Sequence, residues 1–479
     1  MAISPISRLS LLPRLPRFLS SFTASPSAIV APEAPTAVKP IIDLGDTDRL
    51  FAAEATGRLA WSLATMYALA VGPAVDLGIA VMRSRAVMEN AALRAAVMAA
   101  VRGTVYRQFC AGEETEEASE TLRRLWEKGL RGILDYGLED AEDAGACDRN
   151  LAGFMRTVDV TPALPDSSVS FACVKITAIT PISLLERVSD LLRWEKKNPS
   201  LHLPWKQPSL PVLADSSPLY HTPAAPPPLS QEEERELRLS HDRLSALCHR
   251  CSEANLPLLV DAEYTSVQPA IDHMTFSAAL EFNRQPHPLV YGTVQAYLKD
   301  SKLRLMQAVD AAERVGISLG FKLVRGAYMS RESGLAASLG VASPIHDSID
   351  RTHACYNECA SFLLERITTG GSASAVFATH NLESGKAAAA KAMELGIGKG
   401  NQKLQFAQLM GMADGLSLGL KNAGFQVSKY LPFGPVEQVM PYLLRRAEEN
   451  RGFLSTSTID RDLMREELKR RLKVAVLGK

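Results

Sequence analysis

Residues 289–328 read LVYGTVQAYLKDSKLRLMQAVDAAERVGISLGFKLVRGAY, and their pattern indicates the fold class. Two runs rich in β-branched and aromatic residues, 289–297 and 319–328, flank a segment with apolar residues at helical spacing. This pattern predicts a strand, a helix and a second strand. Strands that alternate with amphipathic helices are typical of an α/β protein with a parallel sheet.

The same alternation continues on both sides of this unit. Six further runs of strand character are ILDYGL (133–138), FACVKIT (171–177), LPLLVDAE (256–263), AVFATHN (375–381), KLQFAQLMG (403–411) and FQVSKYLPFG (425–434). Eight strands with seven intervening helical segments, and a helix after the last strand, predict a (βα)8 barrel of the TIM type. A doubly wound sheet is the competing architecture, but GIGKGN at 396–401 matches neither Gly-rich phosphate motif that such a sheet usually carries.

The regions around the barrel differ in composition. Residues 46–129 are rich in Ala and Leu with charges at helical spacing, which predicts an α-helical N-terminal region. We expect the barrel over residues 130–455 and a C-terminal helical tail over residues 456–479. The prolines of residues 194–230 exclude regular structure, so we expect an inserted loop after the second strand and before the second barrel helix. Docking of a partner to this Pro-rich loop is an alternative role.

The first 35 residues have the composition of an organelle transit peptide. They contain Arg8, Arg14 and Arg17, many serines and no acidic residue before Glu33. The spacing of the arginines favours a mitochondrion over a plastid. We therefore expect residues 1–35 to be a mitochondrial transit peptide outside the fold.

Residues 59–82, LAWSLATMYALAVGPAVDLGIAVM, raise the question of a membrane span. The Gly72-Pro73 break and Asp76 count against a continuous span of about 20 residues. We expect two helices that are joined at Gly72-Pro73 and pack on the rest of the protein. Peripheral contact with a membrane stays open.

Charge and cysteine content limit the classes of partner. Lys and Arg total 53 and Asp and Glu total 53, so no overall field attracts nucleic acid. Seven cysteines, an odd number in a long chain, do not indicate a disulfide framework and fit a reduced compartment. Cys248 and Cys251 form a CxxC, but no second pair is near it, and Cys355 and Cys359 lie one helical turn apart. We expect no metal site.

The segment PVEQVMPYLLRRAEENRGF, residues 435–453, places Tyr442, Arg445, Arg446 and Glu449 at i, i+3, i+4 and i+7. A surface helix normally has its apolar stripe at this spacing, so this polar face predicts a ligand cavity. Adjacent arginines repel each other unless an anion lies between them, and the guanidinium fork suits a carboxylate. A small acid is the expected ligand. The alternative is a solvated face with an ordinary Arg445–Glu449 pair.

Polar residues also recur within or directly after the apolar runs. In a (βα)8 barrel the reactive residues lie at the C-terminal ends of the strands. Buried polar groups cost stability unless a ligand, water or another polar group satisfies them, so six such strands indicate a substrate and a sizeable cofactor. The residues are Lys175, Asp261, Glu263, Gln295, Lys322, Arg325, His380, Asn381 and Tyr430.

Six motifs in order carry a family resemblance. VKITAI, LLVDAE, VQAYLK, KLVRGAY, FATHN and YLPFGPVEQVMPYLLRRAEEN have the order and spacing seen in proline dehydrogenases, so residues 130–455 resemble that family in its monofunctional plant type. The resemblance implies FAD-dependent oxidation of L-proline to 1-pyrroline-5-carboxylate, the first step of proline catabolism to glutamate. A hydride would pass from proline C5 to flavin N5, and the electrons would go to a membrane quinone. It also implies the matrix side of the inner mitochondrial membrane as the location.

The resemblance assigns nine residues to the substrate. Lys175, Arg445 and Arg446 would hold the proline carboxylate, and Asp261 would lie near the amine. The alternatives are a strand-end lysine that reaches solvent and, for Asp261, a helix N-cap. The proline ring would be walled by Ala327, Tyr328, Leu409, Tyr430 and Tyr442.

Eight further residues would hold FAD: Gln295, Lys322, Val324, Arg325, Thr379, His380, Asn381 and Glu449. Lys322 stands where relatives with VKGAY often have Arg next to flavin N5, and Arg325 replaces their Lys. This exchange leaves the contacts of both residues open and bears on the redox tuning of the flavin. The alternatives are a core histidine for His380 and a pair with Arg445 for Glu449.

Two other functions compete with proline oxidation. A 4-hydroxyproline dehydrogenase could use the same scaffold, but the phenol of Tyr430 beside C4 of the substrate leaves little room for a hydroxyl. A non-catalytic flavin- or proline-binding protein would show damage to the carboxylate clamp or the flavin contacts, and the sequence shows none.

Overall fold

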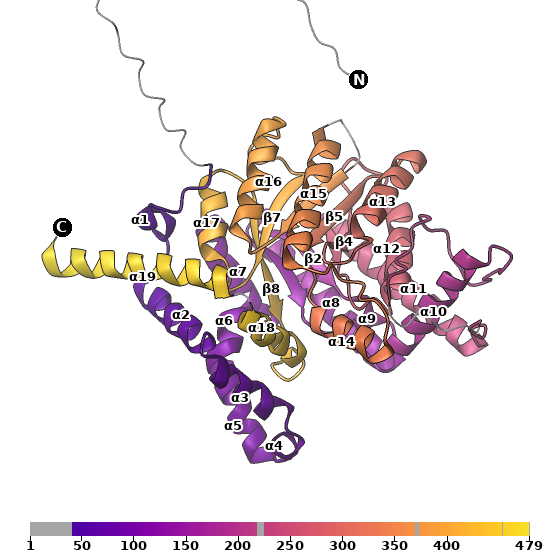
Figure 1. The fold of residues 1–479 in the computed structure, drawn as a ribbon, viewed down its shortest axis with the longest axis horizontal. Coiled ribbons are helices and arrows are strands. Elements are labelled where there is room, and N and C mark those ends of the chain that lie inside the picture. The colour runs from indigo at the N-terminus through magenta and orange to yellow at the C-terminus, as the bar shows by residue number, and fades with distance from the viewer. Residues whose placement is uncertain (1–40, 218–224, 369–372, 453, 479) are drawn as a thin grey trace, which may run out of the picture. The chain divides into compact units, whose positions relative to one another are not determined.

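Eight parallel strands form a closed barrel in sequence order in the computed structural model, which describes residues 41–217, 225–368, 373–452 and 454–478 (Figure 1). Strand β8 pairs with β1, with Ile133 opposite Tyr430, and this pairing closes the sheet. The barrel and its eight strands are confirmed. The strands are β1 (Arg131–Tyr136), β2 (Val169–Val174), β3 (Leu258–Val260), β4 (Val290–Gln295), β5 (Leu319–Val324), β6 (Ala373–Ala378), β7 (Leu404–Leu409) and β8 (Val427–Phe433).

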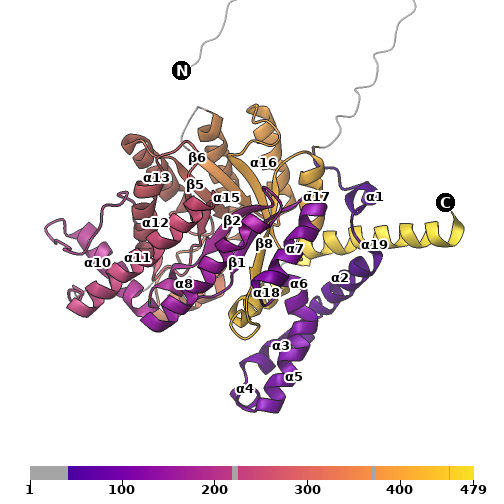
Figure 2. The ribbon, with the colours of Figure 1, turned by 180° about the vertical axis from the view of Figure 1, so that it is seen from behind.

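Helices surround the barrel, and each connection between consecutive strands includes at least one of them (Figures 1 and 2). In α13, Leu305, Ala308 and Ala312 form a buried stripe, and the helix ends at Gly316 in a left-handed conformation with φ of 73°. The helices of these connections are α8 (Ala144–Asp159), α9 (Ile176–Ile179), α10 (Ile182–Lys197), α11 (Gln231–Glu253), α12 (Gln268–Phe282), α13 (Ser301–Val315), α14 (Met329–Leu339), α15 (Ile349–Thr368), α16 (Leu382–Glu394) and α17 (Asp414–Asn422).

The connection from β2 to β3 contains the Pro-rich stretch. Helix α10 continues to Lys197, so the irregular part begins about four residues later than the sequence indicates. The described residues 198–217 and 225–230 form neither helix nor strand. Helix α11 then begins with a capping box, in which Ser230 and Glu233 each accept from the other's backbone N–H.

The chain before the barrel is helical. Helices α2 and α3 are separated at Ala70 and Val71, which confirms two helices in place of one span. The junction lies just before the expected Gly72-Pro73, which form the first turn of α3 because proline is tolerated there. Among the described residues, no helix combines the length and apolar character needed to cross a bilayer. These elements are α1 (Thr47–Leu50), α2 (Thr56–Leu69), α3 (Gly72–Arg83), α4 (Arg85–Glu89), α5 (Ala91–Val101), a π-helical turn (Arg102–Tyr106), α6 (Arg107–Phe109) and α7 (Thr115–Glu127). The expected transit peptide, residues 1–35, lies outside the described residues.

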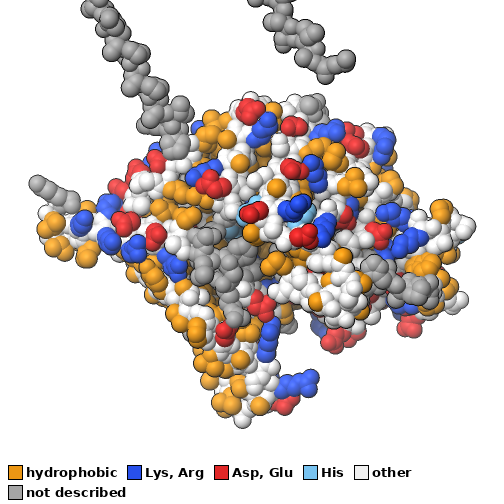
Figure 3. Space-filling model, in the orientation of Figure 1, with side chains coloured by type: hydrophobic (Ala, Val, Ile, Leu, Met, Phe, Trp, Pro, Cys, Tyr) orange, Lys and Arg blue, Asp and Glu red, His pale blue; other side chains and the backbone are white. Residues whose placement is uncertain are grey.

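Helices α3, α4 and α5 extend away from the barrel in both ribbon views (Figures 1 and 2). Val71, Leu77 and Leu93 are more than half exposed on this extension. Apolar side chains cover much of its visible face in Figure 3. After β8, helix α18 (Met440–Gly452) contacts α2 and α3, and α19 (Leu454–Leu477) packs along α2.

Aromatic and aliphatic side chains fill the interior of the barrel. Phe171 and Tyr291 pack edge to face, with ring centroids 4.9 Å apart. A Cβ on Gly320 would lie 2.2 Å from the Tyr291 ring, so this strand position requires glycine. The interior of the barrel is therefore largely apolar, and the polar residues of the predicted site lie at the C-terminal ends of the strands.

Candidate active site

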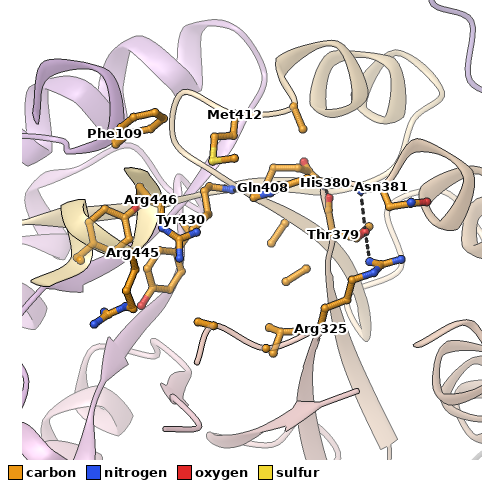
Figure 4. A pocket seen from close by; sticks show the side chains of 18 of the residues that line it. Phe109, Arg325, Thr379, His380, Asn381, Gln408, Met412, Tyr430, Arg445 and Arg446 are labelled. Carbon is orange, nitrogen blue, oxygen red and sulfur yellow. Dashed lines mark hydrogen bonds between the residues drawn. The ribbon is translucent and has the colours of Figure 1, made fainter. Parts of the chain in front are cut away.

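A cavity of about 650 Å³ lies at the C-terminal ends of the strands, and Tyr442, Arg445 and Arg446 of α18 line part of it (Figure 4). This volume is in the range of small-molecule and cofactor sites. Glu449 belongs to α18, but its side chain lies outside the described part of the structure. Glu263, which the strand pattern also indicates, is not among the described lining residues. The sixteen other residues that the resemblance assigns to the substrate or FAD all line the cavity: Lys175, Asp261, Gln295, Lys322, Val324, Arg325, Ala327, Tyr328, Thr379, His380, Asn381, Leu409, Tyr430, Tyr442, Arg445 and Arg446.

The lining has two distinct polar groups. Figure 4 shows Tyr430, Arg445 and Arg446 on one side and Arg325, Thr379 and Asn381 on the other. The first group comes from β8 and α18, and the second from the ends of β5 and β6. The cavity therefore has room for two polar ligand groups at separate places.

Asp261 is the centre of the hydrogen-bond network on the first side. Its Oδ1 accepts from Lys322 Nζ and, at 3.1 Å, from Cys173 Sγ, and its Oδ2 accepts from Tyr430 OH at 2.8 Å. Lys175 Nζ lies 3.7 Å from Asp261 Oδ2 and 3.3 Å from both carboxylate oxygens of Asp135. The N-cap of α12 is Val267, so the expected alternative of an N-cap role for Asp261 is wrong.

The charges of this network depend on one another. Burial disfavours ionisation of Asp261, but the ammonium groups of Lys322 and Lys175 outweigh it and lower its pKa to about 2. Burial also opposes the charge on Lys175, yet Asp135 and Asp261 raise its pKa well above the usual lysine range. Lys175 is 6% exposed, so it does not reach solvent. Burial likewise opposes the charge on Lys322, but Asp261 raises its pKa, so both lysines are charged inside the cavity.

The two arginines of α18 have different surroundings. Arg445 donates through both terminal nitrogens to the Glu139 carboxylate, at 2.6 and 2.9 Å, and the Glu139 side chain is 6% exposed. The guanidinium of Arg446 lies over the Tyr442 ring at 5.1 Å, and Arg446 is 6% exposed. The polar face of α18 is therefore turned into the protein. The alternative of a solvated face is wrong, because Glu139 forms the bidentate pair with Arg445.

Arg325 organises the second side. Its guanidinium donates to Thr379 Oγ1, Ser384 Oγ and His353 Nδ1 at 2.8, 2.8 and 2.9 Å. Burial lowers its pKa, but arginine remains charged at neutral pH. Asn381 is the N-cap of α16, where its Oδ1 accepts from Ser384 N at 2.8 Å. A cation and a helix N-terminus thus lie together at one end of the cavity.

His380 and Gln295 occupy fixed positions in the wall. Burial and the nearby cations Arg446, Lys429 and Arg325 lower the pKa of His380 to about 3, so its imidazole is neutral. Its Nε2 accepts from the backbone N–H of Leu409 at 3.1 Å. Gln295 Nε2 donates to the Glu263 carbonyl at 3.0 Å. These contacts leave other polar atoms of both side chains available to a ligand.

The sequence interpretation missed several residues of the site. Asp135 lies in the predicted strand ILDYGL, and its polar side chain within an apolar run was the same signal that pointed to the other strands. Glu139 follows that strand directly. Met66 and Phe109, from the N-terminal helices, also line the cavity, and no local pattern distinguishes them from core residues.

The cysteine pairs lie away from the cavity lining. Cys248 and Cys251 are buried in α11, and Cys355 and Cys359 are buried in α15. Within the described ranges, no three His, Cys, Asp or Glu residues are grouped so that they could bind a metal ion.

The family model described as Proline dehydrogenase matches residues 118–458. Proline dehydrogenase 1, mitochondrial, from Arabidopsis thaliana is 54% identical and covers 90% of this chain and 87% of its own length. Proline dehydrogenase 2, mitochondrial, from the same plant is 51% identical, with coverages of 95% and 97%. Human Hydroxyproline dehydrogenase is 32% identical, with coverages of 88% and 92%. The names of both plant relatives agree with the mitochondrial location expected for this chain.

The solved structures agree on the barrel. Proline utilization A (PutA) from Bdellovibrio bacteriovorus, inactivated by N-propargylglycine, superposes with a TM-score of 0.58 at 20% identity. The match covers 90% of this chain but 41% of that longer chain, and at this identity it supports the fold alone. The family model covers more than half of the chain, and relatives above 50% identity cover nearly all of it. The chain therefore belongs to the proline dehydrogenase family.

Proposed function

We propose that this protein oxidises L-proline to 1-pyrroline-5-carboxylate with FAD as its cofactor, and that a membrane quinone accepts the electrons. The observation that carries the proposal is a single cavity in which Arg445 and Arg446 lie on one side and Arg325 lies by a helix N-terminus on the other. Lys175 belongs to the first side, because it lies beside Asp261, which binds Tyr430. The membership of the family and the names of the plant relatives support proline as the substrate.

The residues of the second side fit FAD. A diphosphate needs cations and N–H donors, and Arg325, Thr379 and the N-terminus of α16 supply them together. Gln295, Lys322, Val324, His380 and Asn381 would complete the FAD contacts, and Glu449 is proposed on the family resemblance. These residues would hold FAD, which would supply the hydride-accepting chemistry for proline C5.

The residues on the first side would bind and orient the substrate. Lys175, Arg445 and Arg446 would hold the proline carboxylate. Three cations around one anion orient the substrate and also strengthen its binding. Ala327, Tyr328, Leu409, Tyr430 and Tyr442 would enclose the ring and exclude water from it. No side chain becomes a covalent nucleophile in this proposal.

Asp261 would act on the amine of proline. With a pKa of about 2, its carboxylate is ionised at physiological pH and attracts a substrate ammonium or orders a water beside it. Lys322 and Tyr430 hold this carboxylate in place through their hydrogen bonds. The Lys322 ammonium also places a fixed positive charge in the cavity, where it would favour negative charge on the reduced cofactor.

We also propose peripheral association with the matrix side of the inner mitochondrial membrane. The support is the extension formed by α3, α4 and α5, on which Val71, Leu77 and Leu93 are exposed (Figure 3). Leu69 and Ala70, which immediately precede the extension, line the cavity. An apolar electron acceptor in the bilayer would then meet the protein near the cavity.

The proposal is tested by steady-state turnover of purified protein with FAD, L-proline and a soluble quinone analogue. We expect proline-dependent reduction of the quinone and formation of the cyclic imine, with little turnover of 4-hydroxyproline. Absence of turnover in protein that has bound FAD would refute the proposed activity. Efficient turnover of 4-hydroxyproline over proline would favour the alternative dehydrogenase on the same scaffold.

A further inference from the structure

A ring of side-chain contacts joins three barrel loops to α18 at the rim of the cavity. The Arg445 guanidinium lies over the Tyr328 ring at 5.3 Å, and the Tyr328 ring packs edge to face against Tyr264, with centroids 4.6 Å apart. Tyr264 OH donates to Asp140 Oδ2 at 2.9 Å. Asp140 is adjacent in sequence to Glu139, which binds Arg445 through both its oxygens and so completes the ring.

Asp140 has a backbone conformation that residues other than glycine rarely adopt. Its φ is 56°, in the left-handed region, which costs energy for a residue other than glycine but less for Asp and Asn. Its N–H donates to Thr177 Oγ1 at 3.1 Å, and Thr177 Oγ1 donates to Glu263 at 2.5 Å. The loop after β1 is therefore tied twice to the loop after β3, once through Thr177 and once through Tyr264. Strained backbone of this kind persists where the surroundings fix it, and it is frequent at functional sites.

Tyr264 is itself held from several directions. It is 6% exposed, and the guanidinium of Arg331, from α14, lies 3.5 Å from the centroid of its ring. Tyr264 is not among the described residues that line the cavity, so its effect on a ligand would act through Tyr328 and Asp140. The Tyr328 ring packs against the Arg445 guanidinium, and Asp140 adjoins Glu139, which binds Arg445.

On the basis of the proposed function, we propose that Tyr264 and Asp140 are positioning residues for the substrate carboxylate. Tyr264 fixes the turn at Asp140, this turn fixes the Glu139 carboxylate, and Glu139 fixes the Arg445 guanidinium for the proline carboxylate. The Tyr264 ring also supports the Tyr328 ring, which walls the substrate. Loss of the Tyr264 hydroxyl therefore weakens proline binding and leaves the residues proposed to hold FAD in place.

The first variant is Tyr264→Phe, which keeps the ring and removes the hydrogen bond to Asp140. A hydrogen bond of ordinary strength corresponds to a rise of about fivefold in KM for proline, with kcat changed less than about twofold. Tyr291→Phe is the matched control, because Tyr291 is a buried tyrosine that packs on Phe171 deeper in the barrel. We expect KM for proline to stay at the wild-type value in this control.

Two substitutions at Asp140 separate positioning from general damage. Asp140→Asn keeps an oxygen acceptor for Tyr264 and tolerates positive φ, so we expect near wild-type KM. Asp140→Ala removes the acceptor and raises the strain, so we expect a KM at least as high as that of Tyr264→Phe. The double variant Tyr264→Phe/Asp140→Ala should be no worse than Asp140→Ala alone, because both changes break one interaction.

An unchanged KM in Tyr264→Phe, or equal effects of Tyr264→Phe and Tyr291→Phe, overturns the positioning role. A fall in kcat without a change in KM also overturns it, because the role concerns the carboxylate clamp and not the chemical step. Wild-type protein that binds FAD but does not oxidise proline refutes the proposed function instead. The two failures are therefore distinguishable.

Discussion

Replacing the arginines of α18 tests the carboxylate clamp most severely. Arg446→Met keeps an apolar side chain of similar length and removes the guanidinium. A hydrogen bond to a charged group contributes about 1.5–3 kcal/mol, so loss of one such contact with the substrate should raise KM for proline about 10- to 150-fold. We expect kcat to change less, because the clamp binds a part of the substrate that does not react.

Arg445→Met has a second consequence. It removes the partner of Glu139, a carboxylate whose pKa is lowered, in spite of burial, because Arg445 binds it. The variant leaves Glu139 buried without its counter-charge, so we expect a fall of several degrees in Tm as well as a rise in KM. Glu139→Gln/Arg445→Met removes the isolated charge, and it should recover most of the Tm without recovery of KM.

The assay combines thermal unfolding of the FAD-bound protein with initial rates over a range of proline concentrations. If KM barely moves in both single variants, neither arginine binds the carboxylate, and the clamp is refuted. If the double variant regains low KM together with Tm, Arg445 serves only to neutralise Glu139. Either result would contradict the roles derived from the geometry of α18.

Three further predictions concern the wall and the buried acids. Tyr430→Ser removes the phenol that donates to Asp261, so it should lower kcat/KM for proline. It should also raise the ratio of kcat/KM for 4-hydroxyproline to that for proline, and an unchanged ratio would show that Tyr430 does not determine which of the two substrates is preferred. Burial raises the pKa of Glu263 from the ordinary 4.5 to about 8. Between these two values Glu263 keeps its proton in the folded protein and loses it in the unfolded chain, so the free energy of unfolding should fall as pH rises from about 4.5 to 8. Glu263→Gln should flatten that part of the Tm profile, and an identical slope in both proteins would count against a protonated Glu263. Gly326 has a φ of 136°, and Gly326→Ala would place a Cβ 2.5 Å from the Tyr297 ring. The clash should displace Ala327 and Tyr328, raise KM for proline and lower stability by about 1–3 kcal/mol. Initial rates would measure the change in KM, and Tm would measure the change in stability.

The strands and the polar residues at their ends could be predicted from local patterns. Alternating strand and helix periods indicate a barrel, and a polar residue inside an apolar strand needs a reason that a ligand or a polar partner supplies. Lys175, Asp261 and Lys322 follow this logic, and all three line the cavity. Asp135 follows it equally well, but a single polar residue also occurs within ordinary strands, so its position in the sequence does not distinguish it.

The partners of these residues could not be predicted from spacing. Arg445 and Glu139 are 306 residues apart, whereas the sequence offered Glu449 at i+4 as a local partner. Tyr264 and Asp140 are 124 residues apart, and the positive φ of Asp140 has no signature in the sequence around it. Met66 and Phe109 come from outside the barrel, so their place in the cavity depends on how the N-terminal helices pack. These features are set by tertiary contacts, which local periodicity does not encode.

We claim that one cavity binds both a flavin and L-proline so that the two react. An anaerobic titration of FAD-loaded protein with L-proline measures this directly through the absorbance of the oxidised flavin. We predict that the absorbance bleaches in proportion to added proline and returns when a quinone analogue is added. A flavin absorbance that stays unchanged at saturating proline, in protein shown to contain bound FAD, would contradict the claim.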